Sequence, residues 1–313
     1  MDTATLLSRL RERDVRLWVE EDRLKCSAPA GALDDEMRTM LTSRKEEVIA
    51  LLRQAETLKS NPSTIVPLKP DGHRPAIFAV SGHGGDVFSL VTLARHLDKE
   101  QPMVGVQPPG LDGTEPLTSV EALARFEIEQ IRRYQPRGPY LIAGHCAGGT
   151  IAFEVAQQLT AAGQQLALLA LIGSPFPTMF RRSQQLLFSL SYPARALASG
   201  SLAVRPTPIL RAPRPPQERA GLSPAVQAEL AAIRRVDNAT LGAIRRYKPK
   251  RYPGQIDLFV ASNDWHQIFK WQAVAGTTCK HSLGEFNIDD LLVEPHVEVL
   301  ATSLRRRLAA LFN

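Results

Sequence analysis

The chain has 313 residues, of which 44% are hydrophobic and 22% are charged, proportions that are ordinary for a globular protein. It holds no apolar run of the roughly 20 residues that a membrane span needs and no signal-like N-terminal stretch, so we expect a cytoplasmic protein with no membrane partner. Three widely separated cysteines argue against a disulfide framework and have no metal-ligand spacing, so no metal site is predicted.

The net charge is +6, and much of the excess is arginine between positions 181 and 251. This basic segment has two interpretations: an ordinary solvated surface, or a surface that meets an acidic partner or a phosphate-bearing ligand. Nucleic acid is not an expected partner, because the sequence holds no recognition motif and its basic residues are not interleaved with aromatic ones.

Residues 1–56 form the first block. Three leucines spaced for one helical face open it, alternation over 15–26 around a polar turn predicts a β-hairpin, and helices are expected from 33 and over 45–52. A segment of about 50 residues builds only a marginal core. We therefore expect a small α+β unit that holds a partner and performs no chemistry.

Residues 57–74 follow as an expected linker. Pro62, Pro67 and Pro70 stand in this segment among polar residues. Prolines at this density favour an extended and fairly stiff chain.

The third block, residues 75–313, alternates between strand and helix patterns. Helices are expected over 88–97 and 120–134. Strands are expected over 76–80, 103–106, 140–143, 166–172 and 256–261. Such alternation predicts an α/β domain with a parallel sheet covered on both faces. The alternation lapses over about 175–245, where Arg-, Pro- and Ala-rich helical pieces predict a lid.

Residues 141–149, Leu-Ile-Ala-Gly-His-Cys-Ala-Gly-Gly, join an expected strand to an expected helix. Small residues around a sharp strand-to-helix turn are typical of a nucleophile elbow, here with Cys146 in the place usually held by serine. The helix start favours a thiolate, which needs less help from a base than a hydroxyl does. The other two cysteines, Cys26 and Cys279, lie in strand-like patterns and are expected to be core thiols.

The third block resembles the type I thioesterase domains of nonribosomal peptide and polyketide synthases, which have the α/β-hydrolase fold with a helical lid. The first block resembles the TubC-type docking domains of nonribosomal peptide synthetases. The thioesterase-like motifs are Gly82–Gly85, Gln107–Gly113, Gln135–Tyr140, the elbow with Phe153–Ala156, Tyr247–Pro249 and Glu294–Val297. The docking-like residues are Leu17–Val19, Leu24, Ala28, Pro29, Leu33, Lys45, Glu46 and Ile49.

In this fold the oxyanion hole takes one backbone N–H from the residue after the nucleophile and one from an early loop, here Ala147 and His83. The family's acid commonly follows the strand after the elbow helix. In this chain that strand ends in residues 173–175, Gly-Ser-Pro, without a carboxylate. Related hydrolases place the acid one strand later, where Asp264 stands. Asp264 is equally well explained as a turn or helix-capping residue.

The family's catalytic histidine precedes the Glu-Pro-His-Val match by six residues. Counting back six residues from Glu294 gives Ile288, and a shift of one or two residues in the alignment gives Asn287 or Phe286. None of these is a histidine, so the usual base is absent. Of the histidines present, His145 is expected to be buried beside the elbow and His296 to be structural. Three others could substitute as the base: His83, His266 and His281.

A cysteine can attack a thioester without a strong base, but hydrolysis of the acyl-enzyme needs an activated water. The residues therefore favour acyl transfer or release over fast hydrolysis. The resemblance implies a substrate presented on the phosphopantetheine of an acyl or peptidyl carrier domain, no bound cofactor, and an upstream synthetase whose C-terminal tail binds residues 1–56. The alternative is a catalytically impaired docked adaptor, a pseudo-thioesterase that binds a carrier domain.

Overall fold

The computed structural model describes residues 6, 10, 15–20, 23–28, 31–50, 52, 64–82, 85, 87–181, 224–261, 270–286 and 290–312. Within these ranges, no helix is both long and apolar enough to cross a lipid bilayer.

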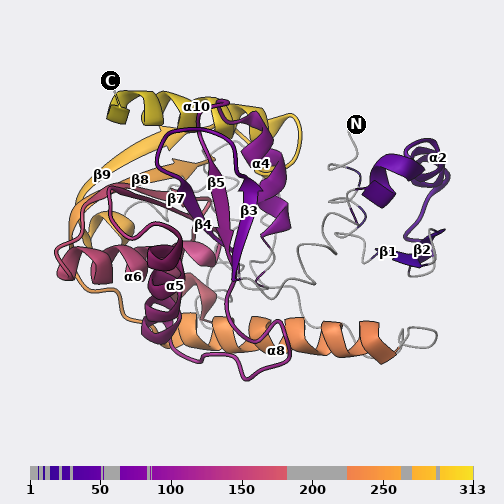
Figure 1. Ribbon diagram of the computed structural model, residues 1–313, viewed down its shortest axis with the longest axis horizontal. Helices are drawn as coiled ribbons and strands as arrows, with labels where there is room; N and C mark the ends of the chain where they lie inside the picture. Colours follow the sequence, from indigo (N-terminus) through magenta and orange to yellow (C-terminus); the bar gives the residue numbers. More distant parts are fainter. Residues whose placement is uncertain are drawn as a thin grey trace, which may run out of the picture.

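The N-terminal unit contains the predicted hairpin and helices (Figure 1). Strands β1 (Arg16–Glu20) and β2 (Arg23–Ser27) pair antiparallel. Helix α2 (Asp35–Ser43) begins where the Asp34 carboxylate accepts a hydrogen bond from the Met37 N–H at 2.8 Å, which is a helix N-cap. A small core of its own holds the unit together, made by Leu6, Leu10, Val15, Met37, Leu41 and Val48. The expectation of a core thiol is wrong for Cys26, which is exposed near the end of β2.

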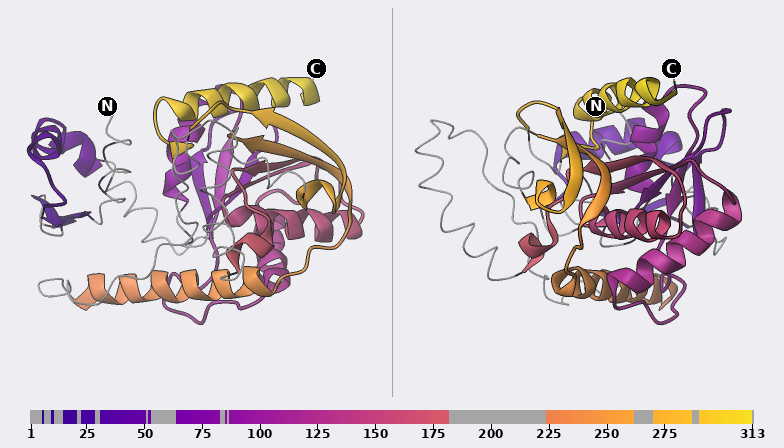
Figure 2. Two further views of the ribbon diagram at one scale, coloured as in Figure 1. Left: turned by 180° about the vertical axis from the view of Figure 1, so that it is seen from behind. Right: turned by 90° about the vertical axis from the view of Figure 1, so that its left-hand side faces the viewer.

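The larger unit is built on a seven-stranded sheet with the order β3-β5-β4-β6-β7-β8-β9 (Figures 1 and 2). Strands β4 to β9 run parallel, and β3 at the edge is antiparallel to β5. Their bounds are β3 Ile65–Lys69, β4 Ile77–Val80, β5 Met103–Val106, β6 Tyr140–His145, β7 Leu166–Ile172, β8 Tyr252–Val260 and β9 Ala275–Ser282. The predicted parallel α/β sheet is confirmed.

Residues 65–69 of the expected linker are extended, as predicted, but they form strand β3 of the sheet and are not part of a linker. Val66 is buried against the sheet while Pro67 is exposed. Proline is tolerated here because β3 is an edge strand, where a missing N–H costs no ladder bond. The sheet therefore begins before the block that the sequence assigned to it.

Helices cover both faces of the sheet (Figure 2). Helix α4 (Val91–His96), which follows the short η1 (Phe88–Leu90), packs with α10 (His296–Phe312) over one face. Helices α5 (Val120–Tyr134), α6 (Gly148–Ala161) and α8 (Pro224–Arg246) share the core on the other face. The two faces thus have separate hydrophobic cores.

The predicted lid region contains η2 (Pro177–Phe180) and α8, and its middle, residues 182–223, lies outside the described residues. Arginine side chains fix α8 to the domain through backbone carbonyls. Arg245 donates to the carbonyl of Phe180 at 3.0 Å, and Arg181 donates to the carbonyl of Arg245 at 3.1 Å. Arg246 donates to the Thr118 carbonyl at 2.8 Å. These three arginines, which are part of the excess positive charge, therefore stabilise the fold.

Candidate active site

Cys146 occupies the turn between the central strand β6 and helix α6. Its backbone has φ of 50°, and it is the one residue other than glycine with a positive φ in the described part of the chain. A side chain with a Cβ is strained in this region, and such strain persists where the surroundings hold it. The Cys146 N–H donates to the Ile172 carbonyl of β7 at 3.0 Å, which fixes the turn to the sheet. The predicted elbow geometry is present at Cys146.

Two glycines after Cys146 let α6 approach the strands closely. A Cβ on Gly148 would lie 2.1 Å from the Ser81 carbonyl oxygen, and one on Gly149 would lie 2.1 Å from Ser174 Oγ. Both distances are far inside van der Waals contact, so the turn needs glycine at both positions. The spacing of small residues in the sequence thus has a direct steric cause.

The Cys146 thiol is half-buried and packs against the core under α5, α6 and α8. It lies two residues before the first residue of a 14-residue helix, whose N-terminal N–H groups and dipole favour a thiolate. The next residue, Ala147, is fully buried and has helical backbone angles. Its backbone is therefore fixed at the start of α6, and its role as an oxyanion donor stays a prediction.

The second predicted oxyanion donor, His83, lies outside the described residues, but the ends of its loop are described. Gly85 donates its N–H to the Gly82 carbonyl at 3.1 Å, which closes a tight turn. A Cβ on Gly82 would lie 3.9 Å from the carbonyl oxygen of His145. This loop thus begins beside the residue that precedes Cys146.

At the end of β7, where the family's acid commonly stands, the structure places Ser174. The Ser174 hydroxyl is buried and donates to the Gly144 carbonyl at 3.0 Å, behind the elbow. The Ser174 carbonyl accepts the indole N–H of Trp271 at 2.9 Å. Ser174 therefore stabilises the turn through these hydrogen bonds. It has no carboxylate and cannot replace the acid. The alternative acid, Asp264, lies outside the described residues.

The region expected to hold the base contains an aromatic pair. Phe286 stacks on His296, the first residue of α10, with ring centroids 4.2 Å apart. Asn287 and Ile288 lie outside the described residues, as do two of the three proposed substitutes, His83 and His266. The structural role expected of His296 stays a prediction.

The third proposed base, His281, belongs to a cluster on the α10 side of the sheet. Its Nε2 lies 2.8 Å from Oδ1 of Asp257, and its ring stacks on Phe259 with centroids 4.4 Å apart. Arg307 of α10 donates to the same carboxylate oxygen at 2.7 Å. Burial acts to raise the pKa of Asp257, but the hydrogen bonds from His281 and Arg307 outweigh it and the pKa is lowered. The imidazole is thus hydrogen-bonded to a buried carboxylate.

A second carboxylate that the sequence did not single out lies on the elbow helix. Glu154 of α6 accepts hydrogen bonds from Tyr247 at 2.5 Å and from Gln157 and Gln158 at 3.0 and 2.8 Å. Burial, and then the bond to Glu154, raise the pKa of Tyr247 well above its usual range. The group joins α6 to the end of α8. Glu154 and Tyr247 both stand in the thioesterase-like motifs, and this is the feature of the sequence that could have pointed to them.

Two family models match the chain. The model of the thioesterase domain matches residues 75–289, and the model of the TubC N-terminal docking domain matches residues 4–54. Among relatives, malpibaldin synthetase from Mortierella alpina is 45% identical over 113 residues, which are 36% of this chain and 2% of the synthetase. The chain therefore spans a small part of such relatives.

Solved structures share the fold. A four-domain nonribosomal peptide synthetase bound to AMP and glycine matches with a TM-score of 0.60 and 22% identity, over 80% of this chain and 21% of that chain. The NocB thioesterase domain matches with a TM-score of 0.58 and 19% identity, over 78% of this chain and 99% of that chain. The architecture is thus that of thioesterase domains, the α/β-hydrolase fold.

Proposed function

The chain belongs to the family of thioesterase domains and carries a TubC-type docking domain, and on that premise we propose that it handles acyl groups in a nonribosomal peptide or polyketide assembly line. In this proposal Cys146 takes an acyl or peptidyl group from the phosphopantetheine of a carrier domain and releases or transfers it. The observation that supports it most is the strained backbone of Cys146, at φ of 50°, in a turn fixed on both sides.

The first step is exchange of one thioester for another. The Cys146 thiolate attacks the carbonyl carbon, a new carbon–sulfur bond forms, and the bond to pantetheine sulfur breaks. The pantetheine sulfur leaves and takes up the proton that Cys146 lost. The N–H groups of Ala147 and His83 stabilise the oxyanion between these events. Because the two thioesters are similar in energy, this step needs no strong base.

The second step decides whether the protein hydrolyses or transfers the acyl group. Hydrolysis requires an activated water, and transfer requires an amine, hydroxyl or thiol acceptor. Asp264 is the proposed acid, and His83, His266 or His281 the proposed substitute base. Because His281 is hydrogen-bonded to Asp257, His83 or His266 is favoured over it as the substitute base.

The docking unit, residues 1–56, is proposed to bind the C-terminal tail of an upstream synthetase in the cytoplasm. A tail that adds a strand to the hairpin of β1 and β2 would use backbone hydrogen bonds for affinity. Binding through this unit raises the local concentration of a weakly bound carrier domain.

Intact-protein mass spectrometry with acyl- and aminoacyl-pantetheine thioesters tests the covalent step. The expected result is one acyl adduct on the wild type and on Cys26→Ser, whose thiol is exposed, and none on Cys146→Ala. An adduct that persists on Cys146→Ala would overturn the proposed mechanism.

The alternative, a docked adaptor without catalysis, is supported by the contacts of Ser174 and of Phe286, which stand where the family's acid and base are expected. It predicts that a carrier domain binds with equal affinity to the wild type and to Cys146→Ala. It also predicts that no acyl donor labels either protein, even when the donor is carrier-bound.

A further inference from the structure

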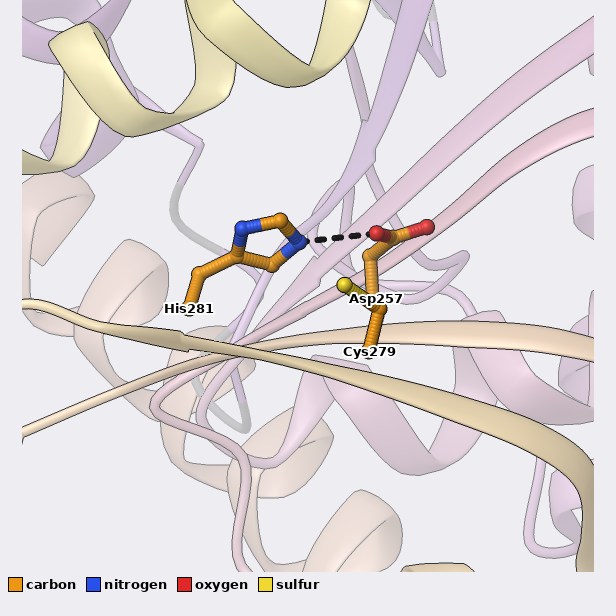
Figure 3. Close-up of side chains that lie close together, drawn as sticks. All are labelled: Asp257, Cys279 and His281. Carbon is orange, nitrogen blue, oxygen red and sulfur yellow. Dashed lines mark hydrogen bonds and ion pairs between the residues drawn. The ribbon is translucent and has the colours of Figure 1, made fainter.

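Asp257, Cys279 and His281 lie together on one face of strands β8 and β9 (Figure 3). Asp257 and Cys279 are register partners, as are Phe259 and His281. Because side chains alternate along a strand, all four project from the same face. Arg307 reaches this face from α10. The position is on the opposite side of the sheet from α6, which carries the elbow.

One ligand atom from each of the three residues, a carboxylate oxygen, a thiol sulfur and an imidazole nitrogen, lies within 4.8 Å of the other two. Asp257 is buried, with 1% of its side chain exposed, while the His281 side chain is 16% exposed. Cys279 is half-buried, and the expectation of a fully buried core thiol is therefore wrong for it. The cluster thus combines a buried anchor with two groups that solvent can reach.

We propose that Asp257, Cys279 and His281 form a binding site for one zinc ion, with solvent in the fourth position. Oxygen, nitrogen and sulfur donors together suit Zn²⁺ better than Ca²⁺ or Mg²⁺, which prefer oxygen alone. Bonds of about 2.0–2.3 Å in a tetrahedron place the ligand atoms about 3.2–3.6 Å apart. The 2.8 Å separation of His281 Nε2 and Asp257 Oδ1 then opens by about half an ångström.

Binding of zinc changes the protonation of its ligands. Cys279 releases its thiol proton to solvent, and the proton of His281 resides on Nδ1 so that Nε2 coordinates the ion. The charges of the carboxylate and the thiolate offset those of the ion. Arg307 and Gln255, which donate to the two oxygens of Asp257, hold the carboxylate in place from outside the site.

Zinc bound in this way ties the sheet's edge strand, β9, to β8. Two ligands come from β9 and one from β8, and the anchor carboxylate is also bonded to α10. The expected consequence is a higher melting temperature in the presence of zinc, since an ion that binds the folded state stabilises it.

Cobalt titration of the full chain, purified without a histidine tag, tests the proposal, because a thiolate ligand to Co²⁺ gives a charge-transfer band in the near ultraviolet. We expect this band to saturate at one equivalent in the wild type, Cys26→Ser and Cys146→Ser, and to be absent in Cys279→Ser. Zn²⁺ should displace Co²⁺. A band that is missing in the wild type, or that survives in Cys279→Ser, would overturn the zinc site.

His281→Gln provides a second readout if Cys279→Ser does not fold. We expect its affinity for Zn²⁺, measured against a chromophoric chelator on folded protein, to fall at least tenfold, because one of the three ligands is lost. Unchanged affinity in a folded His281→Gln would contradict the assignment of His281 as a ligand, and with it the proposal.

Discussion

Gly149 and Ser174 meet behind the Cys146 turn with no room for another atom, since a Cβ on Gly149 would lie 2.1 Å from Ser174 Oγ. The Ser174 hydroxyl in turn donates to the Gly144 carbonyl of β6 at 3.0 Å. The residues that follow β7 therefore pack against the strand-to-helix turn and stabilise it. These contacts hold the strained backbone of Cys146, together with the hydrogen bond that its N–H donates to the Ile172 carbonyl.

Gly148→Ala should destabilise the protein and weaken acylation of Cys146. Its Cβ would lie 2.1 Å from the Ser81 carbonyl oxygen, so the backbone must shift, at a cost of about 1–3 kcal/mol in the free energy of unfolding. Urea denaturation measures the loss. Gly242→Ala is the matched control, since its Cβ would meet nothing closer than Arg246 Nη1 at 3.5 Å. Equal stabilities of the two variants would contradict the steric argument.

Cys146→Ser should lose at least about 100-fold in the rate of acylation by pantetheine thioesters. A serine hydroxyl depends on a base that the sequence does not place in its usual position, whereas a thiol is partly ionised at neutral pH. Single-turnover kinetics measures this rate. A serine variant as fast as the wild type would show that an efficient base acts on residue 146.

Glu127→Gln should make stability less dependent on pH. Both carboxylate oxygens of Glu127 are buried without a hydrogen-bond partner among the described residues, and burial raises its pKa well above the usual range. The folded state therefore binds the proton more tightly than the unfolded state. Its contribution to stability is complete below the unfolded pKa and is lost as pH rises through the folded pKa.

Urea denaturation from pH 4 to pH 8 checks the role of Glu127. We expect Glu127→Gln to match the wild type at the acid end and to be more stable at the alkaline end. Glu129→Gln, an exposed change on the same helix, should follow the wild type throughout. A wild type whose stability rises relative to Glu127→Gln with increasing pH would contradict the account.

Tyr247→Phe should lower the free energy of unfolding by about 1–3 kcal/mol, because it removes a hydroxyl that donates to the carboxylate of Glu154 and leaves that buried group less well bonded. Tyr134→Phe is the matched control, since Tyr134 is 45% exposed. Thermal unfolding of the two variants side by side measures the difference. Similar losses in both would mean that the Tyr247–Glu154 bond has little weight.

The sequence predicted the parts of the fold in which local pattern and tertiary packing agree. The strand-turn-helix around Cys146 is one such part, because its glycines are required by contacts within a few residues or with neighbouring strands. The strand β3 was missed because Pro67 and Pro70 outweighed the apolar residues around them. An edge strand accepts proline, but only the pairing with β5 reveals that these residues are at an edge.

The Asp257, Cys279 and His281 cluster could not be predicted from spacing. Its members lie far apart in sequence, and the register between β8 and β9 is what brings them together. The braced position of Ser174 was equally hidden, because a serine after a strand gives no signal of the carbonyl it will bond. By contrast, the absence of a histidine at Phe286 was visible in the sequence, and the structure adds the stacking partner that Phe286 has, His296.

The central claim is that Cys146 is acylated by carrier-bound thioesters. The most direct measurement is intact-protein mass spectrometry of the full chain after it is mixed with an acyl-loaded carrier domain, beside Cys146→Ala. The account predicts a mass increase of one acyl group that is present in the wild type and absent in Cys146→Ala. No adduct and no Cys146-dependent consumption of the acyl-loaded carrier would contradict it.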